Sequence, residues 1–469
     1  MFERWSHNRW VRNRYTRKLA QWARRILSLL SGRSQGVAHV PFVGSAPTMP
    51  GWLQEELSRM AAIEPELLPG GVSVDHYAFY SVPMDGRPGR AYSTLADDVG
   101  GHPYTHVLLI PWLKQGGADR GILYHAKAIA ESSPDARILV LSTENSASPW
   151  AERLPPQARH VDFAQHVAGL DFGHQVAVMV RLLVQLQAPL IHLINSRVGW
   201  EAVLRHGLAL KQHSRLVASL FCDDYDLRMN PVGYARDYLR YCYPSLSAVI
   251  CDNSRYPRIW SRELGVPASV FKVVPFPYDG ETPQVPVTPL SENDADRVLW
   301  AGRLDRQKRP DVLAAIAAEM PHVHFDVFGS PVMSGAAQQD LGSLRSLANV
   351  TLHGEFQRLE AVASGAHFAY LHTTAWEGTP TILFDVAAAR LPICAPAVGG
   401  IADFIAVEDL VESPSDIDAF VSRLEELRKS PELRHAVVGR QVESLAANRS
   451  WEGFTARLAE LGMLARMPG

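Results

Sequence analysis

Two acidic residues, Glu377 and Asp385, lie eight positions apart around the run Gly378-Thr379-Pro380-Thr381 and the start of a predicted helix. Thr379 suits the N-cap of that helix, and Pro380 suits its first helical position. The helix start would offer unpaired backbone N–H groups and a positive dipole end, which together hold phosphate well. Glu377 can then reach a sugar hydroxyl, and Asp385 a second part of the same ligand. The spacing predicts a site for a phosphate-containing ligand with hydroxyls at both ends, as in a nucleotide sugar.

This segment resembles the Glu-x7-Glu motif of the retaining glycosyltransferases of the large sucrose-synthase-like family (family 4, GT-B fold). The residues that follow, 387–392 and 398–403, are similar to the usual continuation of that motif. The second acid is Asp385 rather than Glu, so its side chain is one methylene shorter. The resemblance implies that Glu377 holds hydroxyls of the transferred sugar and that Asp385 holds the ribose. Taken alone, the segment also fits an ordinary strand–loop–helix unit with surface acids.

A basic segment from Trp300 to Pro310 follows a predicted strand and enters a predicted helix. It is similar to the Gly-Arg-Leu…Lys segment of the same family, which implies that Arg303 and Lys308 bind the donor's diphosphate. The chemistry requires such cations, because departure of a nucleoside diphosphate builds negative charge that preplaced groups stabilise without moving. Arg binds phosphate through two N–H groups, whereas Lys acts as a point charge. Arg303, Lys308 and Glu377 are therefore the predicted catalytic residues.

The sequence predicts no metal and no cofactor, because no Asp-x-Asp cluster is well placed in this half of the chain. The nearest imitation, residues 223–226, belongs to the other predicted domain. The nucleotide sugar would itself be the substrate.

A glycine loop lies between an early predicted strand and helix, from Ile110 to Gly121. Glycines let a backbone come close to a phosphate or sugar and point N–H groups at it. The position of Gly116 and Gly117 is similar to that of the family's glycine loop, which borders the donor phosphates. Asp119 is a candidate contact to the acceptor.

Weaker resemblances complete the predicted cleft. Gly329 ends a strand as the family's nucleotide-side strand does, and Phe356 closes a segment that touches the nucleobase in relatives. Where several relatives carry a His near the reacting sugar, this chain has Cys222 or Asp223. Asn195 and Asp223 are therefore candidate acceptor contacts, and His192 on the preceding strand is more typical of a core His.

The elements that would position these residues alternate between short apolar strands and amphipathic helices, which predicts parallel sheets covered by helices. The predicted fold class is α/β of the GT-B type, with two Rossmann-like domains facing a cleft and an N-terminal helical extension. Ligands bind at the carboxyl ends of such strands. The predicted domains are residues 1–35 (basic amphipathic helix), 36–71 (linker or extension, with a helical patch at Trp52–Ile63), 72–278 (acceptor domain), 297–447 (donor domain) and 448–469 (helix crossing back to the first domain).

The predicted strands of the first domain are His106–Trp112, Arg137–Leu141, Arg159–Phe163, Leu190–Ile194, Leu216–Phe221, Ala248–Cys251 and Phe271–Val274. Those of the second are Arg297–Trp300, Val323–Phe328, Val350–Leu352, His367–Leu371 and Pro392–Ala395.

Bulk properties fit a cytoplasmic enzyme. The chain has 469 residues, of which 47% are hydrophobic and 20% charged, so sizeable cores are expected. A net charge of −3 argues against nucleic acid as a partner of the whole protein. The four cysteines form no C-x-x-C pair, which indicates reduced thiols rather than a zinc site or a disulfide framework. The sequence shows neither a secretory signal nor a run of 18 apolar residues.

The first 35 residues differ from the rest, because nine Arg and Lys residues and one Glu give them a net charge of +8. Apolar residues recur there with helical spacing from Val11 to Leu29. A basic amphipathic helix rich in Trp and Leu is typical of one that lies on an anionic membrane. The same pattern is typical of a helix packed on its own protein or on an oligomer partner, and periodicity does not distinguish the two.

The predicted function is retaining transfer of a sugar from a nucleotide diphosphate sugar to a saccharide or lipid-linked acceptor, in surface polysaccharide or glycolipid assembly. If residues 1–35 bind lipid, the enzyme would be peripheral on the cytoplasmic face of the membrane. The alternative is a non-catalytic GT-B scaffold or regulator of a glycan-assembly complex, and a GT-B epimerase or phosphorylase is a third option. The sequence does not identify the nucleotide, the sugar or the acceptor.

Overall fold

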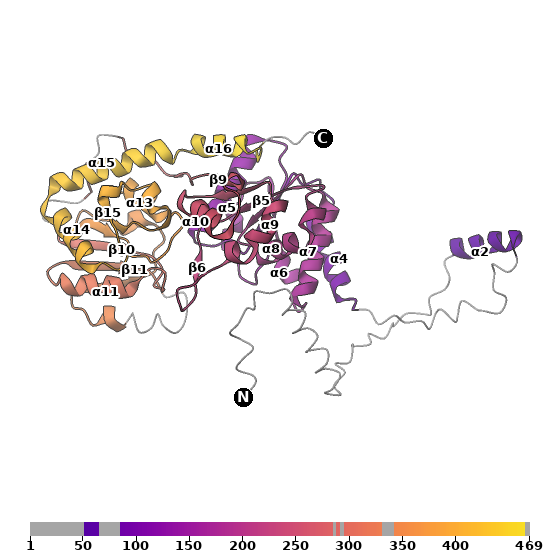
Figure 1. Ribbon diagram of the computed structural model, residues 1–469, viewed down its shortest axis with the longest axis horizontal. Helices are drawn as coiled ribbons and strands as arrows, with labels where there is room; N and C mark the ends of the chain where they lie inside the picture. The colour runs from indigo at the N-terminus through magenta and orange to yellow at the C-terminus, as the bar shows by residue number, and fades with distance from the viewer. Residues whose placement is uncertain (1–50, 65–84, 285–287, 291–294, 331–341, 465–469) are drawn as a thin grey trace, which may run out of the picture. The chain divides into compact units, whose positions relative to one another are not determined.

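The computed structural model describes residues 51–64, 85–284, 288–290, 295–330 and 342–464 (Figure 1). Contacts divide the chain into two units, residues 1–87 and 88–469. The first unit contains the helix α2 (Gly51–Ile63), close to the predicted helical patch. The basic helix predicted for residues 1–35 lies outside the described residues, so it stays a prediction.

The second unit begins with a seven-stranded parallel sheet in the order β3-β2-β1-β4-β5-β8-β9. Its central strands are buried on both faces, which is why they read as continuous apolar runs. The strand order reverses between β1 and β4, and α/β sheets bind ligands at the carboxyl ends of the strands beside such a reversal. The strands are β1 (His106–Ile110), β2 (Ile138–Ser142), β3 (Ala158–Asp162), β4 (Leu190–Ile194), β5 (Arg215–Ser219), β8 (Ala248–Cys251) and β9 (Phe271–Val273).

A second parallel sheet of six strands follows in the order β12-β11-β10-β13-β14-β15. Its order reverses between β10 and β13, so the loops that follow these two strands meet at the sheet's carboxyl edge. The strands are β10 (Arg297–Ala301), β11 (His324–Phe328), β12 (Val350–Gly354), β13 (His367–Leu371), β14 (Ile393–Pro396) and β15 (Leu410–Val411).

Helices cover the faces of both sheets. Those of the first domain are α4 (Arg87–Val99), α5 (Gly117–Ser132), α7 (Phe172–Leu186), α8 (Arg197–Leu210) and α10 (Arg255–Leu264). Those of the second are α11 (Pro310–Glu319), α13 (Ile382–Ala388), α14 (Ile417–Lys429) and α15 (Pro431–Asn448). None of the helices in the described part of the chain is long and apolar enough to cross a membrane.

The last helix, α16 (Trp451–Glu460), packs on the first domain (Figure 1). Trp451 Nε1 donates to Glu131 of α5 at 2.9 Å, and Arg457 donates to the carbonyl of Val273 at 3.2 Å. One cluster of buried apolar residues continues from the first sheet through this helix into the second sheet. The two Rossmann-like domains therefore share part of their core.

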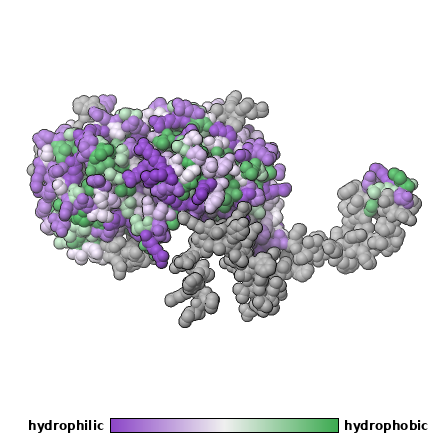
Figure 2. Space-filling model, viewed as in Figure 1, coloured by the Kyte–Doolittle hydropathy of each residue, from purple (hydrophilic) through white to green (hydrophobic). Residues whose placement is uncertain are grey.

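Figure 2 shows hydrophilic residues over much of the visible face, with hydrophobic residues in small separate groups. Large exposed apolar side chains include Leu227 and Met229, between the two strands of a short hairpin, β6 (Asp224–Tyr225) and β7 (Pro231–Val232).

The twelve predicted strands agree with the observed strands to within two residues at every end. The sequence pattern did not identify helices α4, α8 and α10, strand β15 (Leu410–Val411) or the β6–β7 hairpin. The two-sheet α/β architecture is confirmed.

Candidate active site

The loops after β10 and β13 are joined by hydrogen bonds into one structure. The backbone N–H of Ala375 and the hydroxyl of Thr374 both donate to the carbonyl of Gln307, at 2.8 and 3.1 Å. Thr373 Oγ1 donates to the carbonyl of Lys308 at 2.6 Å. The basic segment and the Glu377 segment, about 70 residues apart in sequence, are thereby held in fixed relation at the strand-order reversal.

Lys308 and Glu377 form an ion pair at the centre of this structure. Lys308 Nζ lies 2.6 Å from Glu377 Oε2, and the two side chains are only 12% and 13% exposed. Thr374 Oγ1 and Gln307 Nε2 also lie near Oε2, at 3.1 and 3.5 Å. Glu377 Oε1 accepts no hydrogen bond from any residue that the structure describes. One oxygen thus fixes the carboxylate, and the other is available to a ligand.

His372 lies behind this pair, directly after β13. Its Nε2 is 4.0 Å from Glu377 Oε2, beyond hydrogen-bonding distance. Burial, and next the positive charge of Lys308, hold the pKa of His372 well below its usual range. The ring is therefore neutral at pH 7. The sequence analysis did not single out His372 or the two threonines after it, although three polar residues directly after a buried strand were a usable signal.

Arg303 lies at the open side of the same loop. Its side chain is 53% exposed, with Nε 3.2 Å from Asp305 Oδ2 and one terminal nitrogen donating to Gln307 Oε1 at 2.6 Å. Gln307 therefore connects Arg303 to Glu377. The two predicted cations differ in environment, since Lys308 is nearly buried and Arg303 faces solvent.

Two glycines allow backbone segments to approach closely at this site. Gly399 has a φ of +55°, and a Cβ there would lie 1.8 Å from the carbonyl oxygen of Glu377. Gly329 has a φ of +141°, and a Cβ there would lie 1.8 Å from the carbonyl oxygen of Gly302. Both positions exclude any side chain. Gly329, predicted as a donor-binding residue, thus borders the basic loop.

The glycine loop of the first domain faces the Glu377 segment. A Cβ added to Gly117 would lie 3.5 Å from Thr381 Oγ1, so these two predicted donor-binding residues are neighbours. Gly116 precedes α5, whose first turn contains Asp119.

Asp119 has a different role from the predicted acceptor contact. It is buried, and its Oδ1 accepts from the backbone N–H of Lys114 at 2.9 Å. Burial raises its pKa to about 6. Asp119 therefore organises the glycine loop from within.

The predicted capping of the Glu377 helix is wrong. The helix α13 begins at Ile382 with Thr381 at the N-cap position, so Thr379 and Pro380 lie before it. Thr379 instead binds the first domain: its N–H donates to Asp252 Oδ2 at 2.7 Å, and its hydroxyl donates to the Asp252 carbonyl at 2.9 Å. Burial raises the pKa of Asp252 to about 6. Gly378 lies at the same contact, since a Cβ there would be 3.0 Å from Asp252.

Asp385, the second acid, is paired across the two domains. Its Oδ2 accepts from Arg120 of α5 at 3.0 Å. Burial outweighs the nearby guanidinium and raises the pKa of Asp385 to about 6. A ligand that used this carboxylate would have to share it with Arg120.

The predicted acceptor contacts separate into two kinds. Asn195 follows β4 with a φ of +56°, half-buried at the strand-order reversal of the first sheet. Asp223, the other predicted contact, is buried, and its two oxygens accept from Trp260 Nε1 at 2.8 Å and from Arg236. His192 lies in the core with Nε2 2.8 Å from Ser219 Oγ, as expected of a structural His.

An aromatic group borders the second sheet. The rings of Phe328 and His353 are parallel with centroids 4.4 Å apart, and Phe356 meets Phe328 edge-on at 6.2 Å. His353 Nε2 is also 2.7 Å from Asp326 Oδ1. Phe356 therefore lies at the carboxyl ends of β11 and β12, where a nucleobase is expected.

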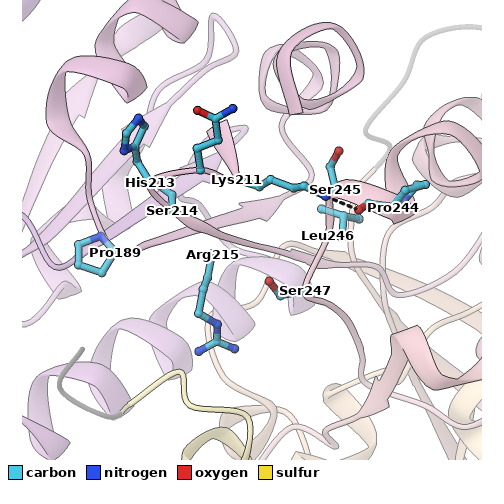
Figure 3. A pocket seen from close by; sticks show the side chains of 10 residues that line it. Pro189, Lys211, His213, Ser214, Arg215, Pro244, Ser245, Leu246 and Ser247 are labelled. Carbon is cyan, nitrogen blue, oxygen red and sulfur yellow. Dashed lines mark hydrogen bonds between the residues drawn. The ribbon is translucent and has the colours of Figure 1, made fainter. Parts of the chain in front are cut away.

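A separate open pocket of about 370 Å³ lies elsewhere in the first domain (Figure 3). Its lining residues include Pro189, Arg215 and Ser247, which directly precede or begin β4, β5 and β8. These are the amino ends of the strands, opposite to the edge where α/β sheets bind ligands. Arg215 is also occupied there by the carbonyls of Leu461 and Gly462. We therefore place the candidate active site at the Lys308–Glu377 pair.

Residues 295–430, which contain this pair, match the family model described as Glycosyl transferases group 1. A D-inositol 3-phosphate glycosyltransferase of Mycolicibacterium paratuberculosis (strain ATCC BAA-968 / K-10) is 27% identical over 173 residues, 34% of this chain and 38% of that protein. The D-inositol 3-phosphate glycosyltransferase of Mycobacterium avium (strain 104) is 28% identical over 173 residues, which are 34% of this chain and 40% of that protein. The match thus spans about two fifths of each relative.

Solved structures resemble a larger part of the chain. Sucrose-phosphate synthase from Thermosynechococcus elongatus superposes with a TM-score of 0.62 at 17% identity, covering 76% of this chain and 98% of that one. Anabaena HepE in complex with UDP gives a TM-score of 0.59 at 16% identity, with the same coverage. This likeness shows the fold, which is GT-B. The part that matches the Glycosyl transferases group 1 model lies in the second half of the chain.

Proposed function

We propose that this protein is a retaining, metal-independent glycosyltransferase that moves a sugar from a nucleotide diphosphate sugar to a saccharide or lipid-linked acceptor. The observation that carries the proposal is the Lys308–Glu377 pair, which leaves Glu377 Oε1 available beside a nearly buried ammonium group. A carboxylate oxygen that accepts from sugar hydroxyls and a cation that faces phosphate are the two groups that a nucleotide sugar requires.

Each residue then has a defined task in the transfer. Lys308 pairs with Glu377 in the structure and directs its N–H donors to the diphosphate when the nucleotide sugar binds. Arg303 approaches the same diphosphate from the solvent side. The bond between the sugar and the leaving oxygen breaks, the acceptor oxygen bonds to the same face, and the leaving phosphate takes the acceptor's proton. Positioning and charge stabilisation supply most of the rate acceleration.

The donor would lie between the two domains. Gly116 and Gly117 offer backbone N–H groups opposite Thr381, and the proximity of Gly117 to Thr381 supports this placement. We assign the nucleobase to Phe356 and the ribose to Asp385. The assignment of Asp385 requires the ribose to compete with Arg120 or to bind the second carboxylate oxygen.

That Arg120–Asp385 pair also favours a second candidate, a non-catalytic scaffold of a glycan-assembly complex. In a scaffold the pair would be a permanent link between the domains. Turnover of a nucleotide sugar distinguishes the two candidates.

The test is incubation of the full chain with a panel of UDP, GDP, ADP and dTDP sugars, without added metal and again with EDTA. The readout is release of nucleoside diphosphate, with Glu377→Ala and Arg303→Ala as controls. Release from one donor that persists in EDTA and disappears in both variants is expected. Loss of release in EDTA would refute metal independence. Absence of both release and nucleoside diphosphate binding would favour the scaffold.

We further propose that residues 1–35 bring the enzyme to an anionic membrane, where it acts on a lipid-linked acceptor in surface polysaccharide or glycolipid assembly. The support is their net charge of +8 and their amphipathic pattern. Flotation with vesicles containing anionic lipid, with and without residues 1–35, tests this. Equal flotation of the two proteins would remove the argument.

A further inference from the structure

His372 is a buried polar group that the proposed transfer does not use. It is 2% exposed, and its Nε2 has no hydrogen-bond partner among the described residues. Buried polar atoms are nearly always paired, so an unpaired one at a functional site requires an explanation. Here the unpaired nitrogen lies 4.0 Å from Glu377 Oε2.

Lys308 occupies the oxygen that His372 faces. Lys308 Nζ lies 2.6 Å from Glu377 Oε2, which makes it the closest donor to that atom. The ammonium charge also disfavours a second positive charge on the neighbouring imidazole. His372 is therefore kept neutral and without a partner while Lys308 remains on Glu377.

Arrival of a nucleoside diphosphate changes this balance. Its phosphate oxygens compete with Glu377 for Lys308. The Lys308 side chain is flexible, and its ammonium group can rotate its three N–H donors toward either partner. Glu377 must stay in place, because its Oε1 would hold the transferred sugar. Loss of the closest donor would leave Oε2 with Thr374 and the distant Gln307. A displacement of about 1 Å would bring His372 Nε2 into hydrogen-bonding distance.

This inference rests on the proposed function. We propose that His372 is a positioning residue, whose Nε2–H binds Glu377 Oε2 when the donor's diphosphate draws Lys308 away from it. His372 then fixes the carboxylate that holds the sugar during transfer. The structure shows His372 without this partner because Lys308 holds Glu377 Oε2.

The alternative is a His that only packs. The ring of Tyr370 lies 6.1 Å from that of His372, and the backbone N–H of His372 donates to the carbonyl of Cys394 at 2.9 Å. A packing role predicts that stability falls when the ring is replaced. The positioning role predicts that the ligand-free protein keeps its stability, because an apolar side chain removes an unpaired buried nitrogen.

The experiment compares wild type with His372→Leu and His372→Gln, since the Gln amide can donate from a place close to Nε2. For His372→Leu we expect an unchanged or higher melting temperature without ligand, a similar KM for the donor, and a kcat lower by about 100-fold, as for a misplaced catalytic group. His372→Gln should recover most of kcat. A matched control is His367→Leu at the other end of β13, which removes a bond to Asp326 and should lower stability without lowering kcat.

Two results would overturn the inference while leaving the proposed function intact. One is a His372→Leu protein as active as wild type. The other is equal loss of kcat in both His372 variants, together with an equal loss of ligand-free stability. A wild-type protein that neither turns over a nucleotide sugar nor binds a nucleoside diphosphate would overturn the proposed function and this inference together.

Discussion

Lys308 Nζ lies 2.6 Å from Glu377 Oε2, so the cation and the carboxylate of the candidate active site form one nearly buried pair. Removing one partner of such a pair leaves an uncompensated charge, which costs more than the pair itself contributes. Replacing both partners should therefore restore the stability that a single replacement removes, but not the activity.

Replacement of Lys308 by Met should lower both turnover and stability. We expect the free energy of unfolding to fall by roughly 2–4 kcal/mol, slightly less than for a fully buried pair because some of each side chain is exposed. Unfolding in urea measures this. The double variant Lys308→Met/Glu377→Gln should regain most of the stability and remain inactive. A double variant as unstable as Lys308→Met would show that the pair is not the cause.

Replacement of Arg303 by Ala should lower turnover without lowering stability. More than half of the Arg303 side chain is exposed, so we expect stability to change by no more than about 0.5 kcal/mol. Turnover should fall by about 100-fold or more, as when a preplaced charge-stabilising donor is removed. Arg262→Ala, a change at an exposed residue of α10, is the control that should leave turnover intact. Equal turnover in the two variants would remove Arg303 from the site.

Replacement of Gly399 by Ala should displace the Glu377 turn, because the new Cβ would overlap the carbonyl oxygen of Glu377. Donor turnover and melting temperature should both fall. Gly439→Ala is the matched control, since a Cβ there meets nothing within 4 Å and lies inside α15. It should leave turnover unchanged and stabilise the helix by about 0.5–1 kcal/mol. A Gly399→Ala protein that matches this control would contradict the described turn.

The alternating apolar runs predicted the sheets well, because parallel strands such as β4 and β13 are buried on both faces. The order of the motifs also placed Arg303, Lys308 and Glu377 in loops of the same domain. Helix α8 was missed because its buried residues include Gly199, Trp200 and Glu201, which form no simple apolar stripe.

Contacts between residues that are distant in sequence could not be predicted from local sequence patterns. The sequence favoured Thr379 as an N-cap, yet its N–H and its hydroxyl both donate hydrogen bonds to Asp252, 127 residues earlier. Asp223 reads as a polar residue at a strand end, and only the fold brings Trp260 and Arg236 to its oxygens. A local sequence pattern predicts the helix or strand to which a residue belongs. It does not predict which distant residue will bind its side chain.

The buried His125 should make the protein sensitive to acid. Burial lowers its pKa to about 4, against an ordinary value of about 6.5 in the unfolded chain. Between about pH 6.5 and pH 4, His125 is protonated in the unfolded state but not in the folded state. The free energy of unfolding therefore falls as the pH decreases toward 4. The difference in pKa corresponds to about 3 kcal/mol.

His125→Leu should reduce this dependence, because it removes the titrating group and keeps a similar volume. Urea unfolding at pH 7 and pH 5 measures the effect in both proteins. If wild type and His125→Leu lose the same free energy of unfolding between pH 7 and pH 5, His125 is not responsible for the acid sensitivity.

The carbonyl of Met463 lies 2.9 Å from His106 Nε2, which joins residues 357 positions apart. Because a chain is synthesised from its N-terminus, the first sheet cannot receive α16 until residues 451–463 have left the ribosome. A nascent chain that stops within the second domain still exposes the apolar surface of α5 that α16 would cover. Such an incomplete chain is a target for chaperones and proteases. Synthesis of α16 is therefore a condition for completing the first domain.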